Sequence, residues 1–237
     1  MSGFFSKFIE YSAEDGAYSL TGDGITAVMF LLFVAIILVA VGVFAAFNSK
    51  KNKGKDNTVF TTKQLVFSAV ALALAFPLSY IKILPMPWGG AITLCSMFFV
   101  TLTGYWYGPV AGFAAAFAYS LLQFMQDGST YMLSLFQVLF DYLLAFTALG
   151  ASGFFKGKKN GMITGYLVAI ILRGLFHSIG GYLYWMDYMP DTFPKSLAFI
   201  YPIVYNYSYI LGEGLITVII LLLPPVKKAL ARIEKEN

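Results

Sequence analysis

The sequence has too little charge for a soluble domain and too few metal ligands for a metal centre. Only 12% of its 237 residues are charged, whereas soluble domains carry about 25%. It contains one cysteine and one histidine, so an intramolecular disulfide and a Cys- or His-rich metal site are excluded. The ATP-binding pattern G-x-x-x-x-G-K-[ST] and the zinc pattern H-E-x-x-H are both missing. No serine or cysteine has a recognisable base partner in sequence. We therefore expect no enzyme activity, no cofactor and no ATPase site in this chain.

Apolar residues dominate instead. They make up 59% of the sequence, and the mean hydropathy is +0.73. Several apolar runs reach the roughly 20 residues that a membrane-spanning helix needs. The net charge of +4 comes from lysine clusters beside these runs, which is typical of membrane orientation and not of nucleic-acid binding. The sequence predicts an all-α polytopic membrane protein, in which Cys95 is a small packed residue.

The N-terminal part predicts one separate membrane helix. An almost purely apolar run covers about residues 25–47, longer than the hydrophobic part of a signal peptide, and its lysines follow it in the linker at 49–63. This order places the extreme N-terminus outside and the lysines in the cytoplasm. We expect residues 1–61 to form this extension and residues 62–237 to form the main membrane domain with a basic cytoplasmic tail.

The main domain is expected to cross the membrane six times. The predicted spans are 64–84 with a break at Pro77, 91–107, 109–125, 131–155, 162–185 and 197–223. Lysine and arginine concentrate in the linker, in the KGKKN loop and in the tail, which all fall on one side if there are six spans. Both ends of this six-helix core would then be cytoplasmic.

Three spans carry polar side chains at one expected depth. Asp141, His177 and Asn206 each lie about ten residues, or ~15 Å, from the outer end of their span. Trp88 and Trp185 lie nearer the outer surface. Intramembrane polar groups usually mark functional sites, although they can also serve only to bond helices together. The common depth, with tryptophans above it, favours a ligand site that opens outward.

Two further patterns concern helix contacts. Arg173 lies one turn deeper than His177 on the same face, and Glu213 lies at a similar depth, so the two charges could pair; the alternative is that Arg173 extends towards the cytoplasmic surface. Ala69 and Ala73 are four residues apart on the first core span, a spacing that lets another helix approach closely.

Spaced polar residues carry a family resemblance over about residues 62–228. The segments SLFQVLFDYLLAFTALGASGFF, LRGLFHSIGGYLYW and YPIVYN resemble the thiamine-specific substrate-binding (S) component of energy-coupling factor (ECF) transporters. The chain departs from the family at Asp141, where the family has glutamate, and at Ser120, where it has tryptophan. The loop before Tyr201 is also longer, and the N-terminal span is additional.

The resemblance implies a set of site residues. Those that match ligand-contacting or neighbouring positions are Trp88, Tyr131, Asp141, Tyr142, His177, Trp185, Tyr201 and Asn206. Ala69 and Ala73 match the alanine motif that the family packs against its transmembrane coupling subunit. The implied function is capture of thiamine at the outside of a bacterial cell membrane, with ATP hydrolysed by two separate ATPase subunits.

Two other functions stay open. Replacement of glutamate by Asp141 is compatible with an S component for another heterocyclic vitamin or a thiamine precursor. A non-transport membrane scaffold of the same fold is the third hypothesis, although a scaffold has no need for Asp141, His177 and Asn206 to converge below tryptophans.

Overall fold

The computed structural model describes residues 9–12, 17–21, 60–128 and 133–236. The chain divides into two units, residues 1–59 with 132–139 and residues 60–131 with 140–237. In the first unit, β1 (Ile9–Ser12) and β2 (Ala17–Leu20) form an antiparallel hairpin in which Tyr11 is opposite Tyr18. The expected N-terminal span and residues 49–59 of the expected linker lie outside the described residues, so both stay predictions. Thr62 and Lys63, at the end of the expected linker, already belong to α2.

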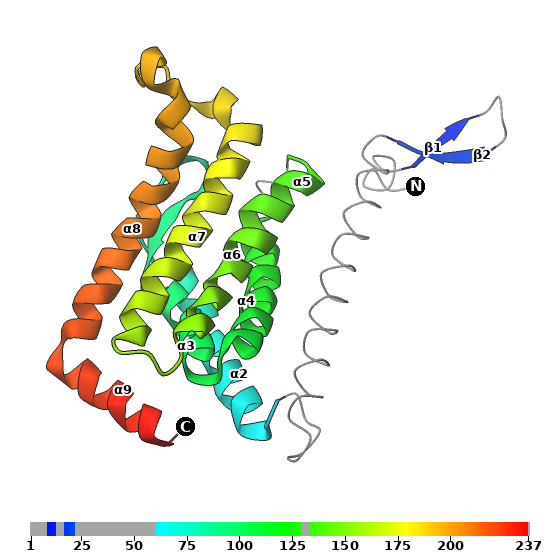
Figure 1. Cartoon of the computed structure of the whole chain (residues 1–237). Helices are drawn as coiled ribbons and strands as arrows, with labels where there is room; N and C mark the ends of the chain where they lie inside the picture. The colour runs from blue at the N-terminus through cyan, green and yellow to red at the C-terminus, as the bar shows by residue number, and fades with distance from the viewer. Residues whose placement is uncertain (1–8, 13–16, 22–59, 129–132, 237) are drawn as a thin grey trace. The chain divides into compact units, whose positions relative to one another are not determined.

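The remaining elements are mostly helical (Figure 1). In chain order they are α2 (Thr62–Tyr80), β3 (Lys82–Pro85), η2 (Pro87–Gly89), β4 (Ala91–Thr93), α3 (Ser96–Tyr107), α4 (Pro109–Gln123), η3 (Phe124–Gly128), α5 (Leu135–Val138), η4 (Leu139–Leu144), α6 (Ala145–Thr147), η5 (Ala148–Phe155), α7 (Gly161–Tyr184), η6 (Met186–Tyr188), η7 (Lys195–Ile200), α8 (Tyr201–Leu222) and α9 (Pro224–Glu236). Of these, α5 belongs to the first unit. The C-terminal tail, expected only to be basic, is therefore a helix of its own.

Four helices in the described part of the chain are long and apolar enough to cross a membrane. They are Thr62–Tyr80, Leu135–Phe155, Gly161–Tyr184 and Lys195–Leu222. These agree with the first, fourth, fifth and sixth expected spans to within a few residues. The helices α3 and α4 have 12 and 15 residues, short of the roughly 20 that a straight crossing needs. Six crossings therefore stay a prediction.

Two expectations for the first two spans were wrong. Pro77 does not break its helix, because α2 continues through it and ends at Tyr80. The second span is not helical from its start, since β4 pairs with β3 and the helix begins only at Ser96. Cys95, just before that helix, is buried and adopts a left-handed backbone conformation with φ of 56°. This conformation is sterically unfavourable for residues other than glycine, so the surrounding packing must hold the turn in place.

Glycines allow α3, α4 and η5 to pack with their backbones in close contact. A Cβ atom on Gly150 would lie 2.5 Å from the Cα atom of Phe113, and one on Gly153 would lie 2.5 Å from the Cα atom of Pro109. A Cβ atom on Gly112 would similarly approach the Cα atom of Gly104 to 2.7 Å. Small residues permit such close approach between membrane helices. The backbones of α3, α4 and η5 therefore pack directly against one another.

A buried carboxylate from α8 fixes the start of α3. Glu213 is 1% exposed. One of its oxygens accepts hydrogen bonds from the backbone N–H of Met97 at 3.1 Å and from the Ser96 hydroxyl at 3.2 Å. The other accepts from the N–H and the hydroxyl of Thr93, at 3.2 and 2.5 Å. A helix N-terminus leaves its first N–H groups without intrahelical partners and favours negative charge. Glu213 therefore joins β4 and α3 to α8.

This arrangement predicts that Glu213 is essential for stability. Glu213→Ala leaves two buried backbone N–H groups and two hydroxyls without their acceptor, so it should lower the free energy of unfolding by about 3 kcal/mol or more. Chemical denaturation of the purified protein in detergent measures this change.

The matched control is Glu234→Ala. Glu234 accepts one exposed hydrogen bond, at 2.7 Å, from the hydroxyl of Tyr105, so the change should be much smaller. Equal losses of stability in the two variants would contradict the proposed role of Glu213.

Candidate functional site

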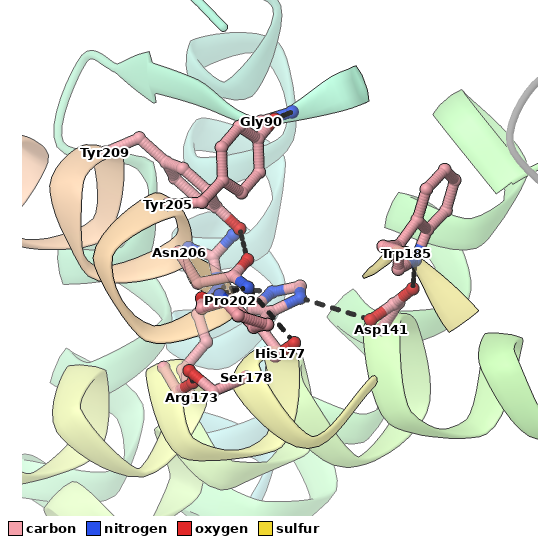
Figure 2. Close-up of polar contacts among 11 residues, drawn as sticks. Gly90, Asp141, Arg173, His177, Ser178, Trp185, Pro202, Tyr205, Asn206 and Tyr209 are labelled. Carbon is pink, nitrogen blue, oxygen red and sulfur yellow. Dashed lines mark hydrogen bonds and ion pairs between the residues drawn. The ribbon is translucent and has the colours of Figure 1, made fainter. Parts of the chain in front are cut away.

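The candidate site is centred on the buried imidazole of His177 on α7, and Figure 2 draws its polar contacts. His177 is 9% exposed. Its Nδ1 atom lies 3.7 Å from Oδ1 of Asp141, which reaches it from η4. Asn206, on α8, donates from Nδ2 to the backbone carbonyl of His177 at 3.2 Å. Three polar residues expected at one depth are therefore brought together by three different helical segments.

Asp141 is contacted from two sides. The indole Nε1–H of Trp185 donates to its Oδ2 atom at 2.7 Å, while its Oδ1 atom faces His177. Gly180 makes this position possible, because a Cβ atom there would lie 2.4 Å from Oδ1 of Asp141. The side chain of Asp141 is 12% exposed. A carboxylate in this setting can attract a cation.

Arg173 determines which nitrogen of His177 carries the proton. Its Nε–H donates to Nε2 of His177 at 3.3 Å, and an imidazole nitrogen that accepts a hydrogen bond cannot itself be protonated. The proton of the neutral ring is therefore on Nδ1, facing Asp141. The guanidinium carbon lies 4.3 Å from the centre of the Phe146 ring, a cation–π distance. His177 thus offers a donor on the side of Asp141.

Neither expectation for Arg173 holds. Arg173 is 9% exposed, so it does not extend to the cytoplasmic surface. Among the described residues it forms no ion pair with Glu213, because the donors of β4 and α3 occupy that carboxylate. Instead, Arg173 belongs to the His177 side of the site, with the ring of Phe146 beneath its guanidinium.

Asn206 can only accept a further hydrogen bond. Both hydrogens on its Nδ2 atom are directed at backbone carbonyls, that of Pro202 at 2.8 Å and that of His177 at 3.2 Å. Its Oδ1 atom accepts from the hydroxyl of Tyr209 at 2.8 Å. An amide oxygen has two lone pairs, so one acceptor position remains after the contacts with the described residues. Asn206 therefore offers a hydrogen-bond acceptor, whereas His177 offers a donor.

Aromatic rings surround these polar groups on two sides. On one side, Phe146 meets His177 edge-on at 6.0 Å and stacks on Tyr142 at 6.5 Å, between ring centres. On the other, Tyr209 meets His177 at 6.3 Å and begins a row that continues through Tyr205 to Tyr201, with 5.8 and 5.9 Å between successive rings. Aromatic walls with a few placed polar groups are typical of sites for flat heterocycles.

The comparison with known families now decides the assignment. The model for the family described as "Thiamine transporter protein (Thia_YuaJ)" matches residues 65–232. The chain belongs to this family. The resemblance drawn from spaced polar residues is thereby confirmed, and so is the class of a helical, multi-pass membrane protein.

Individual members of the family are similar over most of their own length. "Thiamine transporter ThiT" of Bacillus subtilis strain 168 is 27% identical over 175 residues, which are 68% of this chain and 88% of that protein. The solved structure of ThiT from Listeria monocytogenes has 25% sequence identity and a TM-score of 0.56, and the likeness covers 67% of this chain and 90% of that one. The likeness to known members therefore covers two thirds of the chain.

The structure brings together some of the residues expected from the family resemblance. Asp141, His177, Trp185 and Asn206 form the connected polar group, while Tyr142 and Tyr201 join it through ring contacts. Tyr131 lies outside the described residues. The backbone of Trp88 lies in η2, between β3 and β4. None of these placements tests ligand contact, so their roles in binding stay predictions.

Sequence reasoning missed several residues of the site. The spacing of Tyr205 and Tyr209 was a usable signal. Residues four apart share a helix face, so both tyrosines lie on the same face of the helix as Tyr201. Arg173 was noticed but assigned to another partner. Gly180 gave no signal, because its importance comes from the carboxylate of Asp141 on a different helix.

The hydrogen bond from Arg173 predicts the tautomer of His177. Since His177 is the only histidine, its imidazole ¹⁵N NMR signals need no assignment. We expect the Nδ1–H form in the intact protein. Arg173→Met should shift the ring towards the Nε2–H form, because it removes the donor that keeps Nε2 unprotonated. Arg232→Met, on exposed α9, is the control and should leave the spectrum unchanged. A predominant Nε2–H form in the unaltered protein would refute this assignment.

Proposed function

We propose that this protein is the thiamine-binding S component of an ECF transporter, which captures thiamine outside the cell and delivers it inward. Membership of the thiamine transporter family supports the substrate. The observation that carries the proposal is the group formed by Asp141, His177, Trp185 and Asn206, where one partly buried carboxylate lies between an indole N–H and an imidazole. This is an arrangement suited to a flat, cationic heterocycle.

The chemistry of thiamine fits the groups available. Its thiazolium ring is permanently cationic, and a partly buried carboxylate such as Asp141 attracts a cation strongly because the screening by water is weak. The aminopyrimidine ring carries both a donor amino group and acceptor nitrogens. The free lone pair of Asn206 could accept from the amino group, and Nδ1–H of His177 could donate to a ring nitrogen. Trp185, Tyr201 and Tyr142 supply aromatic surface for the cation and the flat rings, and Trp88 and Tyr131 complete the proposed set.

Uptake by this component would depend on partners. Ala69 and Ala73 lie on the exposed side of α2, whereas Ala71 and Ala75 are buried inside the bundle. This supports α2 as the face that meets a transmembrane coupling subunit, because small exposed residues let another helix come close. Two ATPase subunits would supply ATP hydrolysis, so the chain itself would need no cofactor. The lysine-rich linker and tail support a cytoplasmic position for both ends of the core and an outside position for the extreme N-terminus.

The first test is equilibrium binding of thiamine to the purified chain. Calorimetry and quenching of tryptophan fluorescence both measure this binding. Asp141→Asn keeps the shape and removes the charge. Losing a charge-assisted contact corresponds to roughly 1.5–3 kcal/mol, or about a ten- to hundredfold weaker affinity. Asp141→Glu should have a far milder effect, since it restores the residue that the family has.

Two outcomes would count against the proposal. Absence of heat and quenching at high micromolar thiamine would favour another heterocyclic vitamin, a thiamine precursor, or a scaffold role. Loss of thermal stability in Asp141→Asn with an unchanged dissociation constant would make Asp141 a structural residue and remove it from the site.

A second prediction concerns the coupling face. Ala69→Trp or Ala73→Trp should leave thiamine binding intact but abolish uptake in cells that contain the partner subunits, because the indole fills the space of the approaching helix. Leu74→Trp is the control, since it replaces an exposed residue that is already large. Normal uptake in both alanine variants would place the docking face elsewhere.

A further inference from the structure

We propose that Tyr205 is a positioning residue that holds the hairpin segment, residues 82–93, against α8 and thereby retains the bound ligand. The inference rests on the proposed function, because it concerns the stability of the ligand complex. Its structural basis, however, is a set of contacts between the hairpin segment and α8 that can be tested without any ligand.

The hydroxyl of Tyr205 makes two contacts with the tip of the hairpin segment. It donates to the backbone carbonyl of Pro87, and it accepts from the backbone N–H of Gly90 at 3.4 Å. These two backbone groups flank Trp88 in sequence. A single side chain on α8 therefore bonds to the backbone on both sides of the tryptophan that we propose to contact the ligand.

The same segment continues along α8 in close contact. A Cβ atom on Gly90 would lie 2.7 Å from the ring of Tyr209, and one on Gly212 would lie 2.6 Å from Ile92. Thr93 then bonds to Glu213, as described above. Tyr205 and Glu213 are eight residues apart, which is ~12 Å of helix. The segment is thus fixed at its base by a buried carboxylate and at its tip by the Tyr205 hydroxyl.

These contacts connect directly to the candidate site. Tyr209, on whose ring Gly90 rests, donates its hydroxyl to Oδ1 of Asn206, and Figure 2 shows Gly90, Tyr205, Tyr209 and Asn206 grouped together. Displacement of Gly90 would therefore disturb the partner of Asn206 as well as the position of Trp88. Of the two ends, the tip has the weaker attachment, because its hydrogen bonds are with a neutral hydroxyl and those at Glu213 are with a charged group.

Tyr205→Phe tests this role with little change in shape, since it keeps the ring and removes both hydrogen bonds. Tyr207→Phe is the matched control. Tyr207 is also on α8, and its hydroxyl also bonds to a backbone carbonyl, that of Ile171 at 2.8 Å, but this bond joins α8 to α7. The two variants undergo the same chemical change at neighbouring positions of α8, but they release different segments.

The kinetic experiment measures the rate at which thiamine dissociates from the full chain, with stopped-flow fluorescence as the readout. Tyr205→Phe should raise the dissociation rate about five- to tenfold, in line with the loss of one ordinary hydrogen bond to Pro87 and one long hydrogen bond, at 3.4 Å, from Gly90. The change in the association rate should be smaller. Tyr207→Phe should dissociate thiamine at the rate of the unaltered protein. Gly90→Ala should act in the same direction as Tyr205→Phe, because its methyl group would collide with Tyr209.

Hydrogen exchange of the hairpin segment provides the measurement that needs no ligand. In Tyr205→Phe the amides of residues 88–93 should exchange faster, while in Tyr207→Phe they should exchange as in the unaltered protein. Unchanged exchange in Tyr205→Phe would overturn the inference, and so would equal dissociation rates in the two tyrosine variants. If the unaltered protein bound no thiamine but Tyr205→Phe still loosened the segment, the positioning role would stand and the proposed function would fail.

Discussion

The site depends on the placement of one carboxylate inside an apolar bundle. A charged group there needs hydrogen-bond donors or a counter-charge, and Asp141 has the indole N–H of Trp185 on one side and His177 on the other. Each of these partners is held in turn. Arg173 keeps the imidazole proton on the side of Asp141, and Gly180 leaves the space that the carboxylate fills. The position of one carboxylate on η4 therefore requires particular residues along α7 and at its C-terminal end.

The helix α8 has two functions that are usually separate. Its N-terminal half carries Tyr205, Asn206 and Tyr209, which belong to the candidate site or to the contact with the hairpin segment. Deeper in the bundle, Glu213 closes the N-terminus of α3. Because one rigid helix carries all of these groups, the geometry of the site and the attachment of the hairpin segment cannot vary independently. This is a structural reason to expect ligand binding and the stability of the bundle to be coupled.

The sequence alone determined the class of the protein, the family and much of the polar core. A chain crosses a bilayer only as helices or as a closed barrel, because in lipid every backbone polar group must be satisfied within the protein. Apolar runs of about 20 residues indicate the helical solution. The charged and amide residues in these runs were few enough that Asp141, His177 and Asn206 stood out. Their similar distance from the expected outer ends of their spans also predicted that they meet, since helix rise converts sequence position into depth.

Only the tertiary structure decided which groups bond to which. Arg173 and Glu213 have compatible depth and opposite charge, yet the backbone donors of α3 hold Glu213, and His177 accepts from Arg173. Depth gives one coordinate, whereas a hydrogen bond also depends on the rotation of each helix and on its neighbours. The segment before α3 is a second example. Its apolar sequence predicts a helix, but in the structure it is β4, which pairs with β3. The hydrophobicity of a segment indicates that its residues are buried. Which partner a buried polar residue bonds to depends on the competition among the donors and acceptors near it.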